Sequence, residues 1–230
     1  IRKLAKKYKV KVIEDAAQAL GAEYNNKKIG DISDFTTFSF QAIKHITTGD
    51  GGMLCIKDSK LVDVAKRMRW FGIDRKKKQL GVWENDVKEI GYKYQLTDLG
   101  ASIGYQGLLD FKKILSHRIK INDIYLKNLS KNPNIICIHD HDRKKKPAAW
   151  LFTILTKKKD YLQKKLREKN IETNQVHFRN DKYSIFKKFT KNQNYKNMDK
   201  IEDQYLVLPI HTKVSTKDAE YICKLINSYI

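Results

Sequence analysis

The sequence predicts an α/β domain followed by a smaller α+β domain. Short apolar runs alternate with amphipathic stretches in the first half of the chain, which is typical of βαβ units. Residues 97–129 then carry apolar side chains at steps of three and four, as in a long helix. Strand-like runs and a lysine-rich helical stretch follow. We therefore expect a first domain over residues 1–115 and a second over residues 116–230.

The first half opens with the αβ part of a βαβ unit. Leu4 and Tyr8 lie at helical spacing among lysines, and an apolar run over residues 10–15 then predicts a buried strand. Because the first strand of such a unit precedes its helix, we expect the fold to begin upstream of residue 1. The other elements predicted here are strands over residues 36–40 and 52–56 and a helix over residues 59–70.

The second half combines strands and helices without a repeat or a flexible linker. Ser215 and Asp218 have the spacing of a capping box and predict the start of a terminal helix. The other elements predicted here are strands over residues 134–139, 148–156, 175–178 and 205–210 and a helix over residues 162–169. This half therefore fits a small α+β domain.

The charge of the chain is strongly positive, with 47 Lys+Arg against 26 Asp+Glu and a net charge of +21. Such a surplus raises nucleic-acid binding as a function. Eight of the 47 cations are arginines, so 47 − 8 = 39 are lysines, scattered in short runs. Because phosphate and base recognition favour arginine, a lysine bias argues against nucleic acid as the main partner.

The composition also bears on the compartment. Hydrophobic residues make up 41% of the chain, enough for a core, yet no apolar run has the length of a membrane span. The three cysteines, Cys55, Cys137 and Cys223, are far apart in apolar company and lack metal-site spacing. We expect buried thiols in a soluble, cytoplasmic protein that does not bind membranes.

Three polar features fall close together in the first half. Asp15 ends a predicted strand and is followed by Gln18, Ser39 ends the next predicted strand, and Lys44 precedes a glycine turn over residues 49–52. Ligands of α/β sheets bind at the carboxyl ends of strands, and glycine lets the backbone approach a ligand closely. Taken alone, Asp15 could instead cap a following helix.

These features belong to a longer series of motifs that occur in one order along the chain. They are residues 12–22, 30–31, 38–44, 48–52, 69–72, 91–98, 176–178 and 208–211. In sequence and spacing they resemble the DegT/DnrJ/EryC1/StrS family of nucleotide-sugar aminotransferases, pyridoxal-phosphate enzymes with the aspartate-aminotransferase fold, fold type I. The resemblance implies that residues 1–115 are part of a large cofactor domain with a mixed, mostly parallel sheet.

The resemblance assigns roles to four residues. Lys44 matches the catalytic lysine that bonds covalently to pyridoxal 5'-phosphate and later moves a proton as a base. Asp15 matches the acid beneath the pyridine ring, where a carboxylate keeps the ring nitrogen protonated. Gln18 matches an amide near the ring hydroxyl, and Ser39 matches a hydroxyl that donates to the cofactor phosphate.

The resemblance also implies the reaction. Glutamate would give its amino group to the cofactor, and the keto-sugar of a nucleotide-diphosphate sugar would receive it, for amino-sugar and polysaccharide biosynthesis in a homodimer. A branch of the family replaces the lysine by histidine and dehydrates the sugar. Here that position is Lys44, so transamination is favoured, and we expect its neighbour His45 to be a partly buried loop residue.

The chain departs from the family pattern in two places. Lys93 stands where the family commonly has asparagine, at a position that reaches the cofactor phosphate of the neighbouring subunit. We expect Lys93 to keep that role, since an ammonium suits a phosphate. The family's N-terminal portion, with a phosphate-binding turn and a ring-stacking aromatic, has no counterpart here. We therefore expect these 230 residues alone to bind cofactor poorly and to aggregate.

The second half contains further candidate site residues. The resemblance makes His177, Phe178 and Arg179 possible substrate contacts, although Arg179 could equally be a surface arginine beside Asp181. The alternating His and Asp of residues 139–142 look like metal ligands but are more typical of a solvated turn, so we expect no metal site.

Two alternatives to the transaminase remain open. One is a non-catalytic or truncated member of the same scaffold. The other, from a different class, is a basic nucleic-acid-binding protein, which would show steeply salt-dependent RNA binding and no cofactor.

Overall fold

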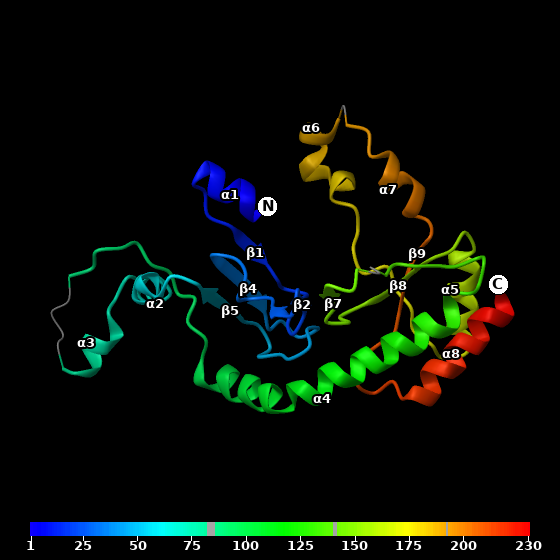
Figure 1. Cartoon of the computed structure of the whole chain (residues 1–230), viewed down its shortest axis with the longest axis horizontal. Coiled ribbons are helices and arrows are strands. Elements are labelled where there is room, and N and C mark those ends of the chain that lie inside the picture. The colour runs from blue at the N-terminus through cyan, green and yellow to red at the C-terminus, as the bar shows by residue number, and fades with distance from the viewer. Residues whose placement is uncertain (82–85, 140–141, 192) are drawn as a thin grey trace. The chain divides into compact units, whose positions relative to one another are not determined.

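The chain divides into two compact units in the computed structural model, which describes residues 1–81, 86–139, 142–191 and 193–230 (Figure 1). The first unit comprises Ile1–Lys112 and Arg143–Ala148, and the second comprises Lys113–Asp142 and Ala149–Ile230. The domain boundary expected between residues 115 and 116 stays a prediction. Each unit is described by itself below.

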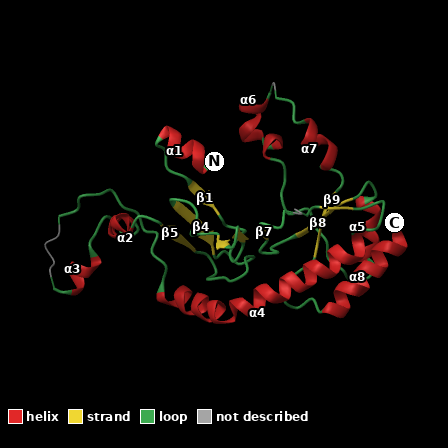
Figure 2. Cartoon of the chain, in the orientation of Figure 1, coloured by secondary structure: helices red, strands yellow, loops and turns green. Residues whose placement is uncertain are grey.

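The first unit contains a mixed three-stranded sheet. β1 (Ile13–Asp15) pairs in parallel with β4 (Phe35–Ser39), which pairs antiparallel with β5 (Gly52–Ile56) (Figure 2). The register places Asp15 opposite Thr37. Because β1 and β4 are parallel, their carboxyl ends lie at the same edge of the sheet.

The prediction of a buried strand over residues 10–15 was wrong in two respects. The strand covers Ile13–Asp15 alone, and the side chains of Val10 and Ile13 are 58% and 73% exposed. The physical reason is topology, because β1 is the outer strand of the order β1-β4-β5. An outer strand needs a further element over it before its apolar residues become buried, and the described residues place none over Ile13.

Short helices and a hairpin complete the first unit. The helices are α1 (Arg2–Tyr8), α2 (Val62–Met68), which follows a 3₁₀ turn at Ser59–Leu61, and α3 (Arg75–Gln79). The hairpin joins β2 (Glu23–Tyr24) to β3 (Lys27–Lys28), and β2 also pairs with β7 (Lys145–Lys146). Asn25 and Asn26 turn the hairpin at φ values of 50° and 58°. Asparagine tolerates this left-handed conformation better than most residues.

The second unit is built on an antiparallel sheet. The strands are β6 (Ile136–Cys137), β8 (Phe152–Leu155) and β9 (Tyr205–Leu208), in the order β6-β8-β9. The helices α5 (Lys159–Arg167) and α8 (Thr216–Tyr229) pack here with the part of α4 (Asp98–Leu129) that follows residue 112. The long helix is present, and Ile121, Tyr125 and Leu129 on its second half are fully buried; the predicted apolar face does not extend to its first half, where Leu108 is 56% exposed.

The region between α5 and α8 departs most from the predicted elements. The strand expected over residues 175–178 was wrong, because pairing ends at a single bridge between Asn174 and Val207. The next amide that could extend this pairing toward β9 is that of Val176, and no backbone hydrogen bond of it is found among the described residues. The elements that follow are 3₁₀ turns at Asn180–Lys182 and Ser184–Phe186 and the helices α6 (Lys187–Thr190) and α7 (Lys196–Ile201).

The start of α8 was predicted correctly. Ser215 Oγ accepts a hydrogen bond from Asp218 N at 3.1 Å, and Asp218 Oδ2 accepts one from Ser215 N at 2.9 Å. This reciprocal pair satisfies two backbone donors that the first helical turn leaves open. Within the described ranges, no helix is both long and apolar enough to cross a membrane.

Candidate active site

Polar side chains from two parallel strands and the loop behind them form the candidate site in the first unit. Asp15 is the last residue of β1 and Ser39 the last of β4. Gln18 lies in the turn after β1, and Lys44 lies in the loop after β4. We call Asp15, Gln18, Ser39 and Lys44 the strand-end cluster. The parallel pairing brings Asp15 and Ser39 to one edge of the sheet, and Gln18 and Lys44 lie in the segments that follow these strands; their roles at a cofactor stay predictions.

The position of Asp15 is fixed by backbone contacts on both sides. Ala16 N donates to the carbonyl oxygen of Thr37 at 2.8 Å, which extends the pairing of β1 with β4 by one residue. Ala17 N donates to Oδ1 of Asp15 at 3.0 Å. The carboxylate therefore caps a turn rather than a helix, and the residue itself stays exposed at the strand end.

A tight turn carries the chain from Ser39 to Lys44. Gln41 N donates to Ser39 Oγ at 3.3 Å, and Lys44 N donates to the carbonyl oxygen of Gln41 at 3.0 Å. The Gln41 side chain accepts from Ile43 N at 3.1 Å. These contacts define the backbone that presents the half-buried Lys44.

The glycine turn after Lys44 folds back onto the end of β4. Phe40 N donates to the carbonyl oxygen of Gly51 at 2.8 Å, and Thr48 N donates to that of Phe40 at 2.9 Å. A Cβ atom at Gly52 would lie 2.6 Å from the carbonyl oxygen of Phe38. The close approach expected of this turn is thus present, and it is made to the protein's own strand.

Three glycines of α4 support the loop and were not recognised in the sequence. Cβ atoms would lie 2.6 Å from Thr48 Cγ2 at Gly104, 3.1 Å from Ile46 Cβ at Gly107 and 3.3 Å from the Thr48 carbonyl oxygen at Gly100. Their spacing of four and three residues puts them on one helix face, and this spacing is the signal that could have identified them. The loop that carries Lys44 therefore rests directly on the helix backbone.

His45 provides a second support for the same loop. Its side chain is 6% exposed, and its Nε2 atom lies 2.6 Å from the carbonyl oxygen of Ala148. The ring also meets Phe111 edge-on, with centroids 6.4 Å apart. The structural role expected for His45 agrees with these contacts, although the residue is fully rather than partly buried.

Lys93 lies on a different part of the first unit. It pairs with Trp70 in an isolated antiparallel bridge, and its Nζ atom lies 5.0 Å from the centre of the Trp70 ring. A Cβ atom at Gly91 would lie 2.0 Å from Gly72 N, so glycine is required for this crossing. Lys93 is exposed, and its expected role at a neighbouring subunit's cofactor phosphate stays a prediction.

The three expected substrate contacts lie in the second unit. His177, Phe178 and Arg179 line a cavity of about 550 Å³. Arg179 is buried and bound to carboxylates, of which Asp181 contributes most to raising the pKa of the guanidinium above its ordinary value. Arg179 in turn holds the pKa of Asp181 below its usual range. Arg179 is therefore not a surface arginine, and the substrate roles of all three residues stay predictions.

The structure also bears on the thiols and on the suspected metal ligands. Cys223 is buried, and burial raises the pKa of its thiol to about 12, whereas Cys55 and Cys137 are half-buried; all three are free. In the part of the chain that the structure describes, no three His, Cys, Asp or Glu side chains gather as metal ligands would. Of the run over residues 139–142, positions 140 and 141 lie outside the described residues.

Comparison with known proteins supports the resemblance. The model of the DegT/DnrJ/EryC1/StrS aminotransferase family matches residues 1–227. The UDP-4-amino-4,6-dideoxy-N-acetyl-beta-L-altrosamine transaminase of Campylobacter jejuni is 34% identical over 227 residues, covering 96% of this chain and 59% of the relative. GDP-perosamine synthase of Escherichia coli is 31% identical over 232 residues, covering 100% of this chain and 61% of the relative.

The fold agrees with the same relationship. The crystal structure of AtS13 from Actinomadura melliaura superposes with a TM-score of 0.89 at 28% identity, covering 99% of this chain and 60% of that one. The predicted α/β fold of type I is thereby confirmed. The chain spans about 60% of the length of the curated relatives it matches. By the match of almost its whole length, the chain belongs to the DegT/DnrJ/EryC1/StrS aminotransferase family.

Proposed function

We propose that the full-length protein is a pyridoxal-phosphate-dependent aminotransferase that moves an amino group from glutamate to the keto-sugar of a nucleotide-diphosphate sugar. One observation carries the proposal. The parallel pairing of β1 with β4 gathers a carboxylate (Asp15) and a hydroxyl (Ser39) at the sheet edge from which the loop of Lys44 leaves.

The strand-end cluster fits the chemistry of this cofactor. The carboxylate of Asp15 would hold a proton on the pyridine nitrogen, and the hydroxyl of Ser39 would donate to the phosphate. The amide of Gln18 would donate to the ring hydroxyl. The amine of Lys44 would bond to the aldehyde carbon, and its loop is held by Thr48 against β4 and α4.

When bound, pyridoxal phosphate accepts the electron pair that remains after the Cα–H bond of an amino acid is broken. Two residues of this chain would assist the breaking of the Cα–H bond. Asp15 would stabilise the positive charge on the ring nitrogen, which strengthens the electron demand. Nζ of Lys44, as a free amine, would take the proton from the substrate Cα and deliver it to C4′ of the cofactor.

The substrate class rests on the relatives. The names of the two curated relatives above specify a UDP-linked and a GDP-linked amino sugar, so a nucleotide-sugar substrate is the shared element. We further propose glutamate as the donor, a homodimer as the active form and a cytoplasmic location for the full-length protein. The three free cysteines support the last point, because reducing compartments keep thiols unpaired.

Covalent labelling tests the proposal directly. The full-length protein is loaded with pyridoxal phosphate, reduced with borohydride and digested, and its peptides are mapped. We expect a pyridoxyl adduct on Lys44, no adduct in Lys44→Ala, and an unchanged adduct in Lys60→Ala, which removes an exposed lysine of the same unit.

Amino transfer from glutamate to UDP- and GDP-linked keto-sugars is then measured on the same preparations. Lys44→Ala should lose activity by about a millionfold, close to the scale of whole enzymatic rate enhancements. A protein that takes up no cofactor, or that is labelled elsewhere, would contradict the proposal. Cofactor labelling without transfer would indicate the non-catalytic scaffold.

A further inference from the structure

The chain between Asn174 and Arg179 makes polar contacts at its two ends, and its middle lacks backbone hydrogen bonds. Asn174 N donates to the carbonyl oxygen of Val207 at 3.3 Å, and Val207 N donates back at 2.8 Å. Among the described residues, no backbone hydrogen bond is made within residues 176–178. In its middle the span makes ring contacts, His177 with Trp150 at 6.2 Å and Phe178 with Tyr183 at 5.0 Å between centroids, and its second polar anchor is Arg179.

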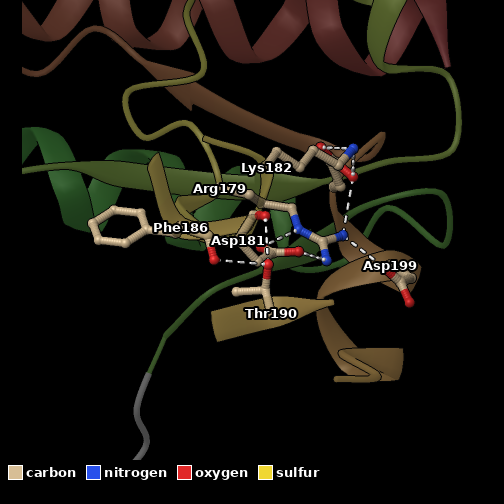
Figure 3. Close-up of polar contacts among 7 residues, drawn as sticks. Arg179, Asp181, Lys182, Phe186, Thr190 and Asp199 are labelled. Atoms are coloured by element: carbon tan, nitrogen blue, oxygen red, sulfur yellow. Dashed lines mark hydrogen bonds and ion pairs between the residues drawn. The ribbon is translucent and has the colours of Figure 1, made fainter. Parts of the chain in front are cut away.

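Arg179 is bound by three carboxylates, with a side chain that is 5% exposed. Its Nε and Nη2 atoms donate to the two oxygens of Asp181 at 3.0 and 2.7 Å, and its Nη1 atom donates to Asp199 at 2.6 Å and to Glu202 at 3.1 Å (Figure 3). Lys182 adds a second cation at 2.6 Å from Glu202. We call these five residues the Arg179 cluster.

The cluster joins two stretches of chain, residues 179–182 and residues 199–202. Asp181 and Lys182 lie in the 3₁₀ turn after Arg179, Asp199 lies in α7, and Glu202 follows α7. The bidentate geometry fixes the direction of the guanidinium as well as its distance. The cluster therefore ties the end of the unpaired span to α7.

The charges of the cluster oppose a phosphate. Two cations and three carboxylates leave a net charge of −1, and all three guanidinium nitrogens of Arg179 already donate to carboxylate oxygens. A diphosphate would have to displace one of these three carboxylates and approach a net negative group. Removing one partner from a buried ion pair is strongly unfavourable.

The span held by the cluster forms one wall of the cavity of about 550 Å³, where His177 and Phe178 lie beside Tyr183 and Glu202. We propose that Arg179 is a positioning residue that holds His177 and Phe178 in place as the substrate-facing wall, and that it does not bind the diphosphate. The proposal rests on the function proposed above. The three carboxylates of the cluster, rather than the substrate, bind the guanidinium of Arg179.

Two variants of the full-length enzyme distinguish positioning from direct binding, because the two roles predict opposite changes in KM for the second variant. Arg179→Ala removes the anchor. Asp181→Asn keeps the shape of the side chain but removes the bidentate charge partner. If Arg179 positions the wall, both variants raise KM for the nucleotide sugar, by about tenfold or more for a displacement near 1 Å. If Arg179 binds the diphosphate, Asp181→Asn frees the guanidinium and lowers KM.

A double-mutant cycle adds a second readout. In a background that carries both His177→Ala and Phe178→Ala, Arg179→Ala should change KM by less than about twofold, because residues that act through one another are not additive. Arg167→Ala is the matched control, since it removes an exposed arginine of α5 in the same unit. A full and additive effect of Arg179→Ala in both backgrounds would overturn the proposal.

Hydrogen–deuterium exchange of the amides of Lys182 and Tyr183, which donate to the carbonyl oxygens of Arg179 and Asn180 at 3.2 Å, makes the test independent of activity. We expect faster exchange in Arg179→Ala and in Asp181→Asn, and no change in Arg167→Ala. Unchanged exchange in both cluster variants would overturn the proposal. If the wild-type protein transfers no amino group, the proposed function fails while exchange still decides whether Arg179 holds the wall.

Discussion

The Nε2 atom of His45 lies 2.6 Å from the carbonyl oxygen of Ala148, so the residue next to Lys44 donates a hydrogen bond to a buried backbone acceptor. The two residues are more than a hundred positions apart in the chain, yet both belong to the first unit. The imidazole thus connects the loop of Lys44 to the strand segment that contains β7.

We predict that His45→Ala destabilises the first unit by about 1–3 kcal/mol, because the Ala148 carbonyl loses its donor without gaining water. Cofactor labelling of Lys44 should fall with it. His117→Ala is the matched control, since His117 makes the same kind of contact, 2.9 Å from the carbonyl oxygen of Val214, in the second unit. Urea unfolding and the fraction of labelled Lys44 are measured together, and equal labelling losses in both variants would refute a local role.

Gly104→Ala should destabilise the protein although it improves helix propensity. In an isolated helix the change would stabilise by about 1 kcal/mol. Here the new Cβ would lie 2.6 Å from Thr48 Cγ2, and relieving that overlap should cost about 1–3 kcal/mol. Gly100→Ala, with its nearest contact to Thr48 at 3.3 Å, should lose less. Thermal unfolding of both variants checks the order, and a more stable Gly104→Ala would argue against the contact.

Lys93→Ala should weaken cofactor binding in the proposed full-length dimer, by about ten- to a hundredfold if one charge-assisted hydrogen bond to the phosphate is lost. Lys93→Asn should retain most of the affinity, since the amide can donate to the same oxygen. Lys88→Ala removes a neighbouring exposed lysine as a control. Titration with pyridoxal phosphate measures the three affinities, and unchanged binding by Lys93→Ala would leave the stacking of Lys93 on Trp70 as its role.

The ion pairs of Glu23 predict a pH dependence. Hydrogen bonds from Lys146 and then Lys28, at 2.7 and 2.6 Å, lower the pKa of Glu23 to about 2 from its ordinary 4.5. A lowered pKa means that the folded state favours the charged carboxylate. Its contribution to stability is therefore complete above pH 4.5 and is lost as the pH falls toward 2.

The matched variants are Glu23→Gln and Glu220→Gln, the second at an exposed position of α8. We expect the stability difference between wild type and Glu23→Gln, measured by urea unfolding, to be present at pH 6 and to vanish on acidification through about pH 2 to 4. Glu220→Gln should show no such loss. A difference that stays constant over the range would contradict the pairing.

Local patterns were sufficient for several elements. β5 and the start of α8 could be predicted because turn residues and the Ser215–Asp218 spacing define them within a few positions. The strand-end cluster could be predicted in part for a general reason. Parallel strands end at a common edge, so Asp15 and Ser39 had to lie near each other once β1 and β4 were paired.

Other features depend on contacts that no local pattern encodes. The pairing of β2 with β7 joins residues more than a hundred positions apart. The exposure of Ile13 follows from the place of β1 in the sheet, and the strand expected at residues 175–178 is absent because pairing with β9 ends at the bridge between Asn174 and Val207. Arg179 could not be assigned to carboxylates because two of them come from α7 and the residue after its end.

No side chains of the three α4 glycines separate the Lys44 loop from the backbone of this helix. Side chains between a loop and a helix can change rotamer and absorb small shifts, but Gly100, Gly104 and Gly107 provide none. Any rotation or translation of this stretch of α4 would therefore displace Ile46 and Thr48 by about the same amount. The Lys44 loop is therefore as rigid as the helix beneath it. A substitution on this helix face is tolerated only if it leaves Lys44 in place, whatever its effect on helix propensity.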